Sequence, residues 1–177
     1  MELEIPDFFL FTDGSGHQDG YGGWASLILG PTYNIAHARM AAAKGTTVER
    51  AEFEALLMGL QSILEQAKLE SSSSLSRLET SPLHVLWLSD RESLVLSVTR
   101  KPDGTPVYRR KASPDLWARF AWYEKIFKIT ARHVKRETNA HHDIVDRLAS
   151  DARVLIKDYM EMPENAIREL LPTAIPA

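Results

Sequence analysis

Two apolar segments of the chain each end on an aspartate. Residues 8–12 precede Asp13, and residues 84–89 precede Asp90. A carboxylate at the end of a buried strand is costly unless its charge is compensated, because an unpaired buried charge loses its hydration. If the two segments pair as parallel strands, both carboxylates lie at one sheet edge, where open α/β sheets place their sites. A single such Asp is typical of a turn or a helix cap, but two on adjacent strands favour a site.

Further acids lie in two expected helices. Glu52 lies at the rim of an apolar helical stripe, one turn before Leu56, and Asp143 and Asp146 open the last helix. Carboxylates that converge on one edge raise each other's pKa values unless cations lie among them. Sets of oxygen ligands suit Mg²⁺ or Mn²⁺, and a pair of such ions is a common apparatus for phosphodiester cleavage. The acids therefore predict a divalent-metal site.

The elements that would position these acids follow from the hydrophobic pattern. Residues 7–13, 21–30 and 33–42 read as strands joined by short Gly- and Pro-containing turns, which predicts an antiparallel meander. Residues 84–90 and 127–134 are two further strands. Helices are expected from Thr47, over 91–100, over 113–127 and over 140–161, whereas the serine-rich residues 71–81 are expected to be a flexible loop. The prediction is an α/β domain with a five-stranded mixed sheet flanked by helices.

Composition narrows the range of functions. The 177 residues fit one domain, and a formal net charge of −3 excludes binding of nucleic acid by bulk electrostatic attraction. The absence of cysteine fits a reducing cytoplasm, and neither a signal peptide nor an apolar run of membrane-spanning length is present. We therefore expect a cytoplasmic protein that does not bind membranes, and no segment points to an obligate protein partner.

Five segments in order resemble ribonuclease H of type 1. They are FLFTDGSG, TVERAEFEALLMGL, WLSD, SPDLWARF and HVKRETNAHHDIVDRLA, and the resemblance covers about residues 7–152. It implies the ribonuclease H fold and Mg²⁺-dependent hydrolysis, with Mn²⁺ as a possible substitute, of the RNA strand of RNA/DNA hybrids. It also implies an endonuclease with a two-metal-ion mechanism and 5′-phosphate products.

The resemblance implies a site of four carboxylates. Asp13, Glu52 and Asp90 match three of them, and the fourth has two alternatives. The motif V-K-R-E-T-N-A-H-H-D matches without a gap and points to Asp143, whereas D-R-L-A points to Asp146. Packing favours Asp146, because residues 145, 148 and 149 then match the positions of this helix that are buried in the family.

The same resemblance suggests where the nucleic acid would lie. Gly14 and Ser15 would be close to its backbone, and the basic segment 100–113 matches a protrusion that grips the hybrid; its candidate contacts are Arg109, Arg110 and Lys111. Three groups that usually read the minor groove are not matched: HQDGYGG replaces the first turn, Glu49 stands where an Asn is common, and Arg91-Glu92 follow Asp90. The strictness of the hybrid preference is therefore left open.

Other residues receive simpler interpretations. His141 and His142 read as an exposed, solvated pair, with substitution for the family's loop His as the alternative. Trp117 and Trp122 read as core anchors. We expect a catalytic domain over residues 1–157, followed by a tail or short packing helix over 158–177. The rival functions are another nuclease of this fold that acts on a different nucleic acid, and a non-catalytic hybrid-binding domain.

Overall fold

The N-terminal third of the chain forms the expected meander. In the computed structural model, which describes residues 5–69, 71–107 and 113–161, β1 (Phe8–Gly16) pairs antiparallel with β2 (Tyr21–Gly30). Strand β2 pairs antiparallel with β3 (Ile35–Lys44). A 3₁₀ turn over Pro31–Tyr33 precedes β3, so the third strand begins and ends two residues later than expected.

Two parallel strands complete the sheet. Strand β4 (Leu83–Ser89) pairs with β1, and β5 (Phe127–His133) pairs with β4. Within the described residues the sheet has five strands in the order β3-β2-β1-β4-β5. In the register between β1 and β4, Phe11 lies opposite Leu88. The carboxyl ends of the two central strands are therefore level with each other.

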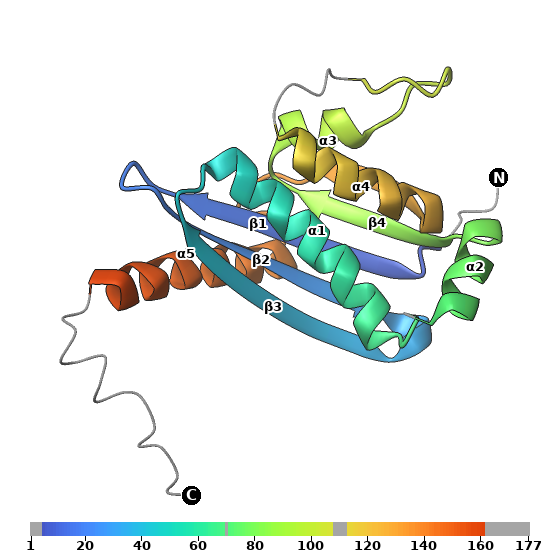
Figure 1. Ribbon diagram of the computed structural model, residues 1–177, viewed down its shortest axis with the longest axis horizontal. Helices are drawn as coiled ribbons and strands as arrows, with labels where there is room; N and C mark the ends of the chain where they lie inside the picture. The colour runs from blue at the N-terminus through green and yellow to red at the C-terminus, as the bar shows by residue number, and fades with distance from the viewer. Residues whose placement is uncertain (1–4, 70, 108–112, 162–177) are drawn as a thin grey trace, which may run out of the picture.

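Helices cover both faces of this sheet (Figure 1). Helices α1 (Val48–Gln66) and α4 (Pro114–Ile126) lie over one face, and α5 (Ala140–Glu161) lies over the other. Side chains of a strand alternate between faces, so β1 contributes Phe8 and Leu10 to the core under α1 and Phe11 to the core under α5. The short α3 (Glu92–Val98) follows β4 directly.

The serine-rich segment is a helix, and the expected flexible loop at 71–81 was wrong. Helix α2 spans Ser72–Thr80, and the Ser71 side chain caps it by accepting a hydrogen bond from the Ser74 backbone N–H at 3.3 Å. Leu78 is buried in the core and Leu75 packs against it. Two apolar residues one turn apart are thus enough to anchor this helix, although its serine-rich composition is typical of a loop.

The end of the chain is described only in part. The expected domain boundary at residue 157 falls inside α5, and residues 162–177 lie outside the described residues. Among the helices of the described part, none has both the length and the apolar character needed to cross a membrane.

Of the two tryptophans expected in the core, one belongs to it. Trp117 packs against the core beside Phe53, with ring centroids 4.4 Å apart, whereas Trp122 is 40% exposed. The dominant buried indole is that of Trp87 in β4, which is fully buried and donates a hydrogen bond of 2.8 Å to the Thr12 hydroxyl. This bond ties β4 to β1 one residue before Asp13.

Replacing Trp87 by Phe should destabilise the protein by about 2–4 kcal/mol, because the change leaves a cavity and deprives the buried Thr12 hydroxyl of its donor. The same change at the half-exposed Trp122 is the matched control and should cost less than about 1 kcal/mol. Urea unfolding measures both. Equal losses for the two variants would contradict the structural role given to Trp87.

Candidate metal centre

Asp13 and Asp90 lie side by side at the carboxyl edge of the sheet. Asp13 follows Phe11 by two residues and Asp90 follows Leu88 by two residues, and Phe11 and Leu88 are register partners. Asp13 is 1% exposed, and the Asp90 side chain is 7% exposed. The parallel pairing expected from the sequence is present and brings the two carboxylates together where it ends. Asp13 is not the last residue of its strand, however, because β1 continues to Gly16 through its pairing with β2.

Helix α1 brings Glu52 to the same place because glycine lets it approach the strand. A Cβ on Gly14 would lie only 2.3 Å from the backbone nitrogen of Glu52, so β1 and α1 are in backbone contact there. Thr47 caps this helix by accepting a hydrogen bond from the Arg50 N–H at 3.2 Å. Glu52 is 2% exposed and therefore lies in the buried seam between helix and sheet.

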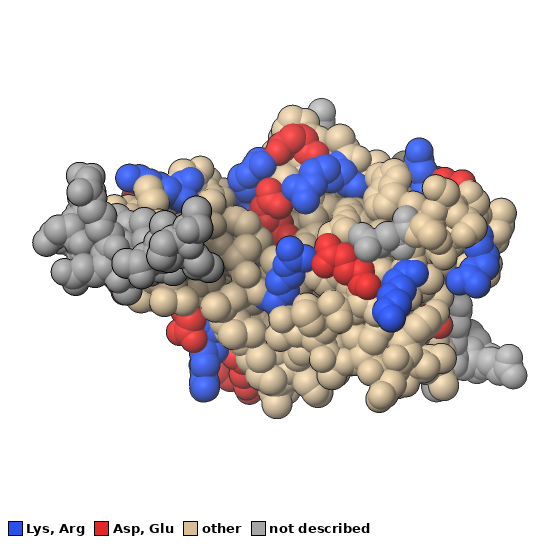
Figure 2. Space-filling view, turned by 60° about the horizontal axis from the view of Figure 1, so that its bottom comes forward, with Lys and Arg blue, Asp and Glu red and all other residues tan. Residues whose placement is uncertain are grey.

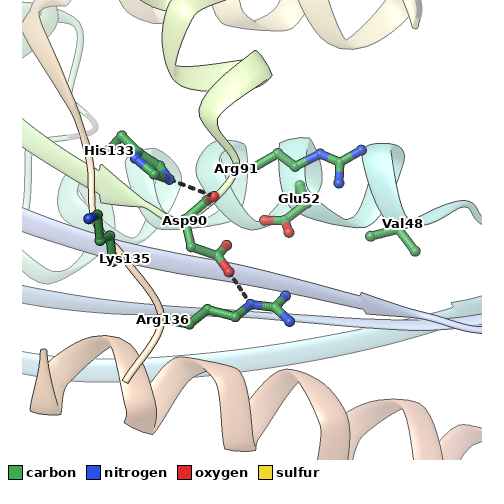
Figure 3. A pocket seen from close by; sticks show the side chains of 7 residues that line it. All are labelled: Val48, Glu52, Asp90, Arg91, His133, Lys135 and Arg136. Atoms are coloured by element: carbon green, nitrogen blue, oxygen red, sulfur yellow. Dashed lines mark hydrogen bonds and ion pairs between the residues drawn. The ribbon is translucent and has the colours of Figure 1, made fainter. Parts of the chain in front are cut away.

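An open cavity of about 510 Å³ gives access to Glu52 and Asp90. It is lined by Val48, Glu52, Asp90, Arg91, His133, Lys135 and Arg136. Figure 3 shows the carboxylates of Glu52, from α1, and Asp90, after β4, facing this space. Arg136, from the segment between β5 and α5, donates a hydrogen bond to Asp90 Oδ2, and the His133 ring lies 3.0 Å from the Asp90 carbonyl oxygen.

Of the two candidates for the fourth acid, Asp146 is the one that lies beside Asp13. Asp146 contributes to the raised pKa of Asp13, and both residues line a second cavity of about 280 Å³ with Gly14 and Ser15. The buried residues Val145 and Ala149 flank Asp146 on the helix, so the phase of α5 turns Asp146 toward the sheet edge. Both aspartates are exposed residues of α5, but Asp143 lies in its first turn and does not line this cavity.

The electrostatics of the cluster follow from burial and like charge. Burial, reinforced by the carboxylates of Asp90 and Asp146, raises the pKa of Asp13 from 3.8 to about 8. Burial also raises the pKa of Glu52 well above its usual value, with Asp13 and Asp90 adding to the effect. Arg136 opposes both shifts. Without a cation, the folded protein therefore keeps the Asp13 carboxyl protonated at neutral pH instead of burying a further negative charge.

His142 belongs to this centre, and the expectation of an exposed, solvated pair was wrong for it. His142 is 1% exposed, and its Nε2 lies 3.8 Å from Asp90 Oδ1. His141, by contrast, is exposed and stacks on Phe11 with ring centroids 5.0 Å apart. The sequence spacing could have predicted this burial. His142 precedes Val145 by three residues and Ala149 by seven, which places it on the inner face of the helix.

The donor set fits a divalent metal ion. Ligand atoms of Asp13, Asp90 and His142 lie within 4.8 Å of one another. Among the residues that the structure describes, the buried atoms Asp13 Oδ1, Glu52 Oε2 and His142 Nε2 have no hydrogen-bond partner. Buried polar atoms without partners are rare, and two of these three belong to the residues whose ligand atoms gather within 4.8 Å, where a cation would satisfy them.

The surroundings of the centre carry charges of both signs. Arg91 pairs with Glu49 at 2.6 Å on the rim of the cavity, and Arg50 pairs with Asp115 at 2.6 Å. On the face drawn in Figure 2, Lys and Arg side chains lie beside Asp and Glu side chains instead of forming a patch of one sign. Five residues were expected to contact the nucleic acid. Gly14 and Ser15 line the cavity beside Asp13 and Asp146, whereas Arg109, Arg110 and Lys111 lie outside the described residues.

The raised pKa of Asp13 predicts how the stability of the metal-free protein depends on pH. The folded state holds the Asp13 proton up to about pH 8, whereas the unfolded chain releases it near pH 3.8. The resulting stability is complete below pH 3.8 and is lost as the pH rises toward 8. Asp13→Asn should therefore raise the free energy of unfolding at pH 8, on the order of 2–5 kcal/mol, and change it little at pH 4.

Chemical denaturation of the metal-free protein at both pH values measures this difference. The exposed Asp151 on α5 provides the matched control, since Asp151→Asn should leave the free energy of unfolding nearly unchanged. An Asp13→Asn effect of the same size at pH 4 and pH 8 would rule out the proposed cause.

Solved ribonucleases H are similar to this chain in structure, although no family model and no curated protein matches its sequence. LC11-RNase H1, from a compost metagenome and in complex with an RNA/DNA hybrid, has a TM-score of 0.64 and 24% identity, and the match covers 85% of this chain and 99% of that chain. The N-terminal RNase H domain of Rv2228c from Mycobacterium tuberculosis has a TM-score of 0.62 and 18% identity, over 86% of this chain and 97% of that chain.

RNase H1 from the halophilic archaeon Halobacterium salinarum has a TM-score of 0.53 and 17% identity, over 82% of this chain and 96% of that chain. The match thus spans nearly the whole of each of these ribonuclease H chains, and TM-scores of 0.53 to 0.64 show that the fold is shared. With the strand order β3-β2-β1-β4-β5 and helices on both faces, the chain has the ribonuclease H fold.

Proposed function

We propose that this protein is a metal-dependent endonuclease, a ribonuclease H that hydrolyses the RNA strand of RNA/DNA hybrids. One observation carries the proposal: the little-exposed carboxyl groups of Asp13, Glu52 and Asp90 gather at one edge of a ribonuclease H fold, and buried oxygens of Asp13 and Glu52 have no hydrogen-bond partner among the described residues. A protein has little reason to bury like charges together unless a cation compensates them.

The proposed metal ligands are Asp13, Glu52, Asp90 and Asp146, with Asp143 as the alternative fourth acid. The chemistry that bound Mg²⁺ or Mn²⁺ ions supply is activation of a water nucleophile and stabilisation of the leaving 3′-oxygen, which yields a 5′-phosphate. Asp13 lies close enough to both Asp90 and Asp146 for their charges to raise its pKa, which supports its assignment as a ligand that two ions would share.

The other residues of the centre would position the substrate and balance charge. Gly14 and Ser15 line the same cavity as Asp13 and Asp146, so the scissile backbone would pass close to these two residues. Arg136 would serve as counter-ion to Asp90, with which it already pairs. Its side chain is 69% exposed, so it can move to a phosphate at little cost.

The hybrid preference is supported by the family resemblance of the motifs and by the similarity to LC11-RNase H1, whose structure contains an RNA/DNA hybrid. Glu49 faces Arg91 in an ion pair instead of presenting an amide to the minor groove. Recognition of the 2′-hydroxyl groups of the RNA strand must then depend on other groups of this chain. We further propose that residues 1–157 constitute the catalytic domain and that the cysteine-free protein acts in the cytoplasm.

Replacing single carboxylates tests the catalytic assignment. Asp13→Asn and Asp146→Asn should each lower the rate of hybrid cleavage by about two orders of magnitude or more, because each removes a charge from the metal site. Asp143→Asn, three residues away on α5 and outside the cavity that Asp13 and Asp146 line, is the matched control and should remain within about threefold of the wild type. A cleavage assay on labelled hybrid measures all three. Activity that survives at 146 but is lost at 143 would reassign the fourth acid to Asp143.

The basic segment predicts the salt dependence of binding. If Arg109, Arg110 and Lys111 contact phosphates, replacing all three by Gln should reduce the slope of log K against log salt by about 2–3, since each phosphate contact contributes slightly less than one to the slope. Binding is measured without divalent ions, so that the hybrid stays intact. Arg39→Gln, which removes a cation paired with Glu65 at 3.1 Å, should leave the slope unchanged. An unchanged slope for the triple variant would show that the segment does not contact the duplex.

A further inference from the structure

His142 is the one side chain of the described centre that an all-carboxylate site does not explain. It is 1% exposed, and its Nε2 has no hydrogen-bond partner among residues 5–69, 71–107 and 113–161. The distance of 3.8 Å from Nε2 to Asp90 Oδ1 is too long for a hydrogen bond. A buried imidazole nitrogen without a partner is costly, so something absent from the protein chain itself would satisfy it.

Helix α5 holds this imidazole in place from its first turn. The Asn139 side chain caps the helix by accepting hydrogen bonds from the N–H groups of His141 and His142 at 3.0 and 3.2 Å. The capped turn is anchored by Val145, which is fully buried. His142 and Asp146 are four residues apart and so lie on neighbouring positions of the helix that face the sheet edge. The imidazole is therefore preorganised beside the carboxylates.

We propose that His142 is a nitrogen ligand of the metal centre and that it gives the centre a preference for a first-row transition-metal ion such as Mn²⁺ over Mg²⁺. This inference rests on the divalent-metal centre of the proposed function. Its geometric basis is that His142 Nε2 and oxygens of Asp13 and Asp90 lie within 4.8 Å of one another, a span that one ion can bridge.

The preference follows from the chemistry of the donors. Mg²⁺ is a hard ion that binds oxygen and gives up its waters reluctantly, so an imidazole adds little to its affinity. Transition-metal ions accept nitrogen and oxygen together, and Mn²⁺ is the member of that series that also suits carboxylates. A set of carboxylates with one buried imidazole therefore stabilises Mn²⁺ more than a set of carboxylates alone.

Metal titration of the metal-free protein, without nucleic acid, tests the preference. In His142→Ala and in the more conservative His142→Gln, the affinity for Mn²⁺ should fall about tenfold or more, while that for Mg²⁺ should change less than about threefold. His141→Ala is the matched control, because His141 is the exposed neighbour, and both affinities should stay at the wild-type level. Equal losses for the two ions, or no loss, would overturn the proposal.

A second measurement needs no variant. Electron spin-echo spectroscopy of the Mn²⁺-loaded wild-type protein should show modulation from a directly bound imidazole ¹⁴N, and labelling of histidine with ¹⁵N should change it. Absence of nitrogen coupling would overturn the proposal, as would failure of the protein to bind Mn²⁺.

The proposal and the proposed function can fail separately. Nitrogen coupling without hybrid cleavage under any metal would leave His142 as a ligand and refute the nuclease. Hybrid cleavage with Mn²⁺ bound but no nitrogen coupling would refute only the role of His142.

Discussion

The parallel register of β1 and β4 is the constraint on which the site depends. It places Asp13 and Asp90 level with each other at a buried edge, where their charges repel and neither is well hydrated. The fold makes this edge rigid: the indole of Trp87 bonds to Thr12 across the two strands, and the backbone of α1 touches β1 at Gly14. The carboxylates therefore have little freedom to move apart, and a cation is the compensation that the geometry leaves open.

The second half of the centre comes from the other face of the sheet. Helix α5 contributes both His142 and Asp146, and the segment before it contributes Arg136. Three acids are thus fixed by the sheet and α1, whereas the remaining donors depend on where one helix begins and how it is turned. If α5 were shifted by one residue along the chain, other side chains would take the places of His142 and Asp146, while the sheet would stay unchanged. If His142 is a ligand as we propose, α5 would set the choice of metal.

Much of the fold could be predicted from the sequence because its strands and long helices carry strong periodic patterns. The strand-end acids and the approach of Glu52 followed from those patterns. The prediction failed where packing overrides composition: Leu75 and Leu78 turn the serine-rich segment into α2, and Trp122 lies on the outer side of α4. His142 was misjudged because a histidine near a helix start is usually solvated, and only the phase of α5 shows that it faces inward. The sequence left Asp143 and Asp146 open for the same reason.

The most direct test of the account is cleavage of a labelled RNA/DNA hybrid by the wild-type protein, with Mg²⁺, with Mn²⁺ and with a chelator, beside single-stranded RNA and a DNA duplex. The account predicts cleavage of the RNA strand of the hybrid only when a divalent ion is present, and fragments that end in 5′-phosphate. Cleavage that persists in the chelator, or hybrid that is bound but left intact under both ions, would contradict it.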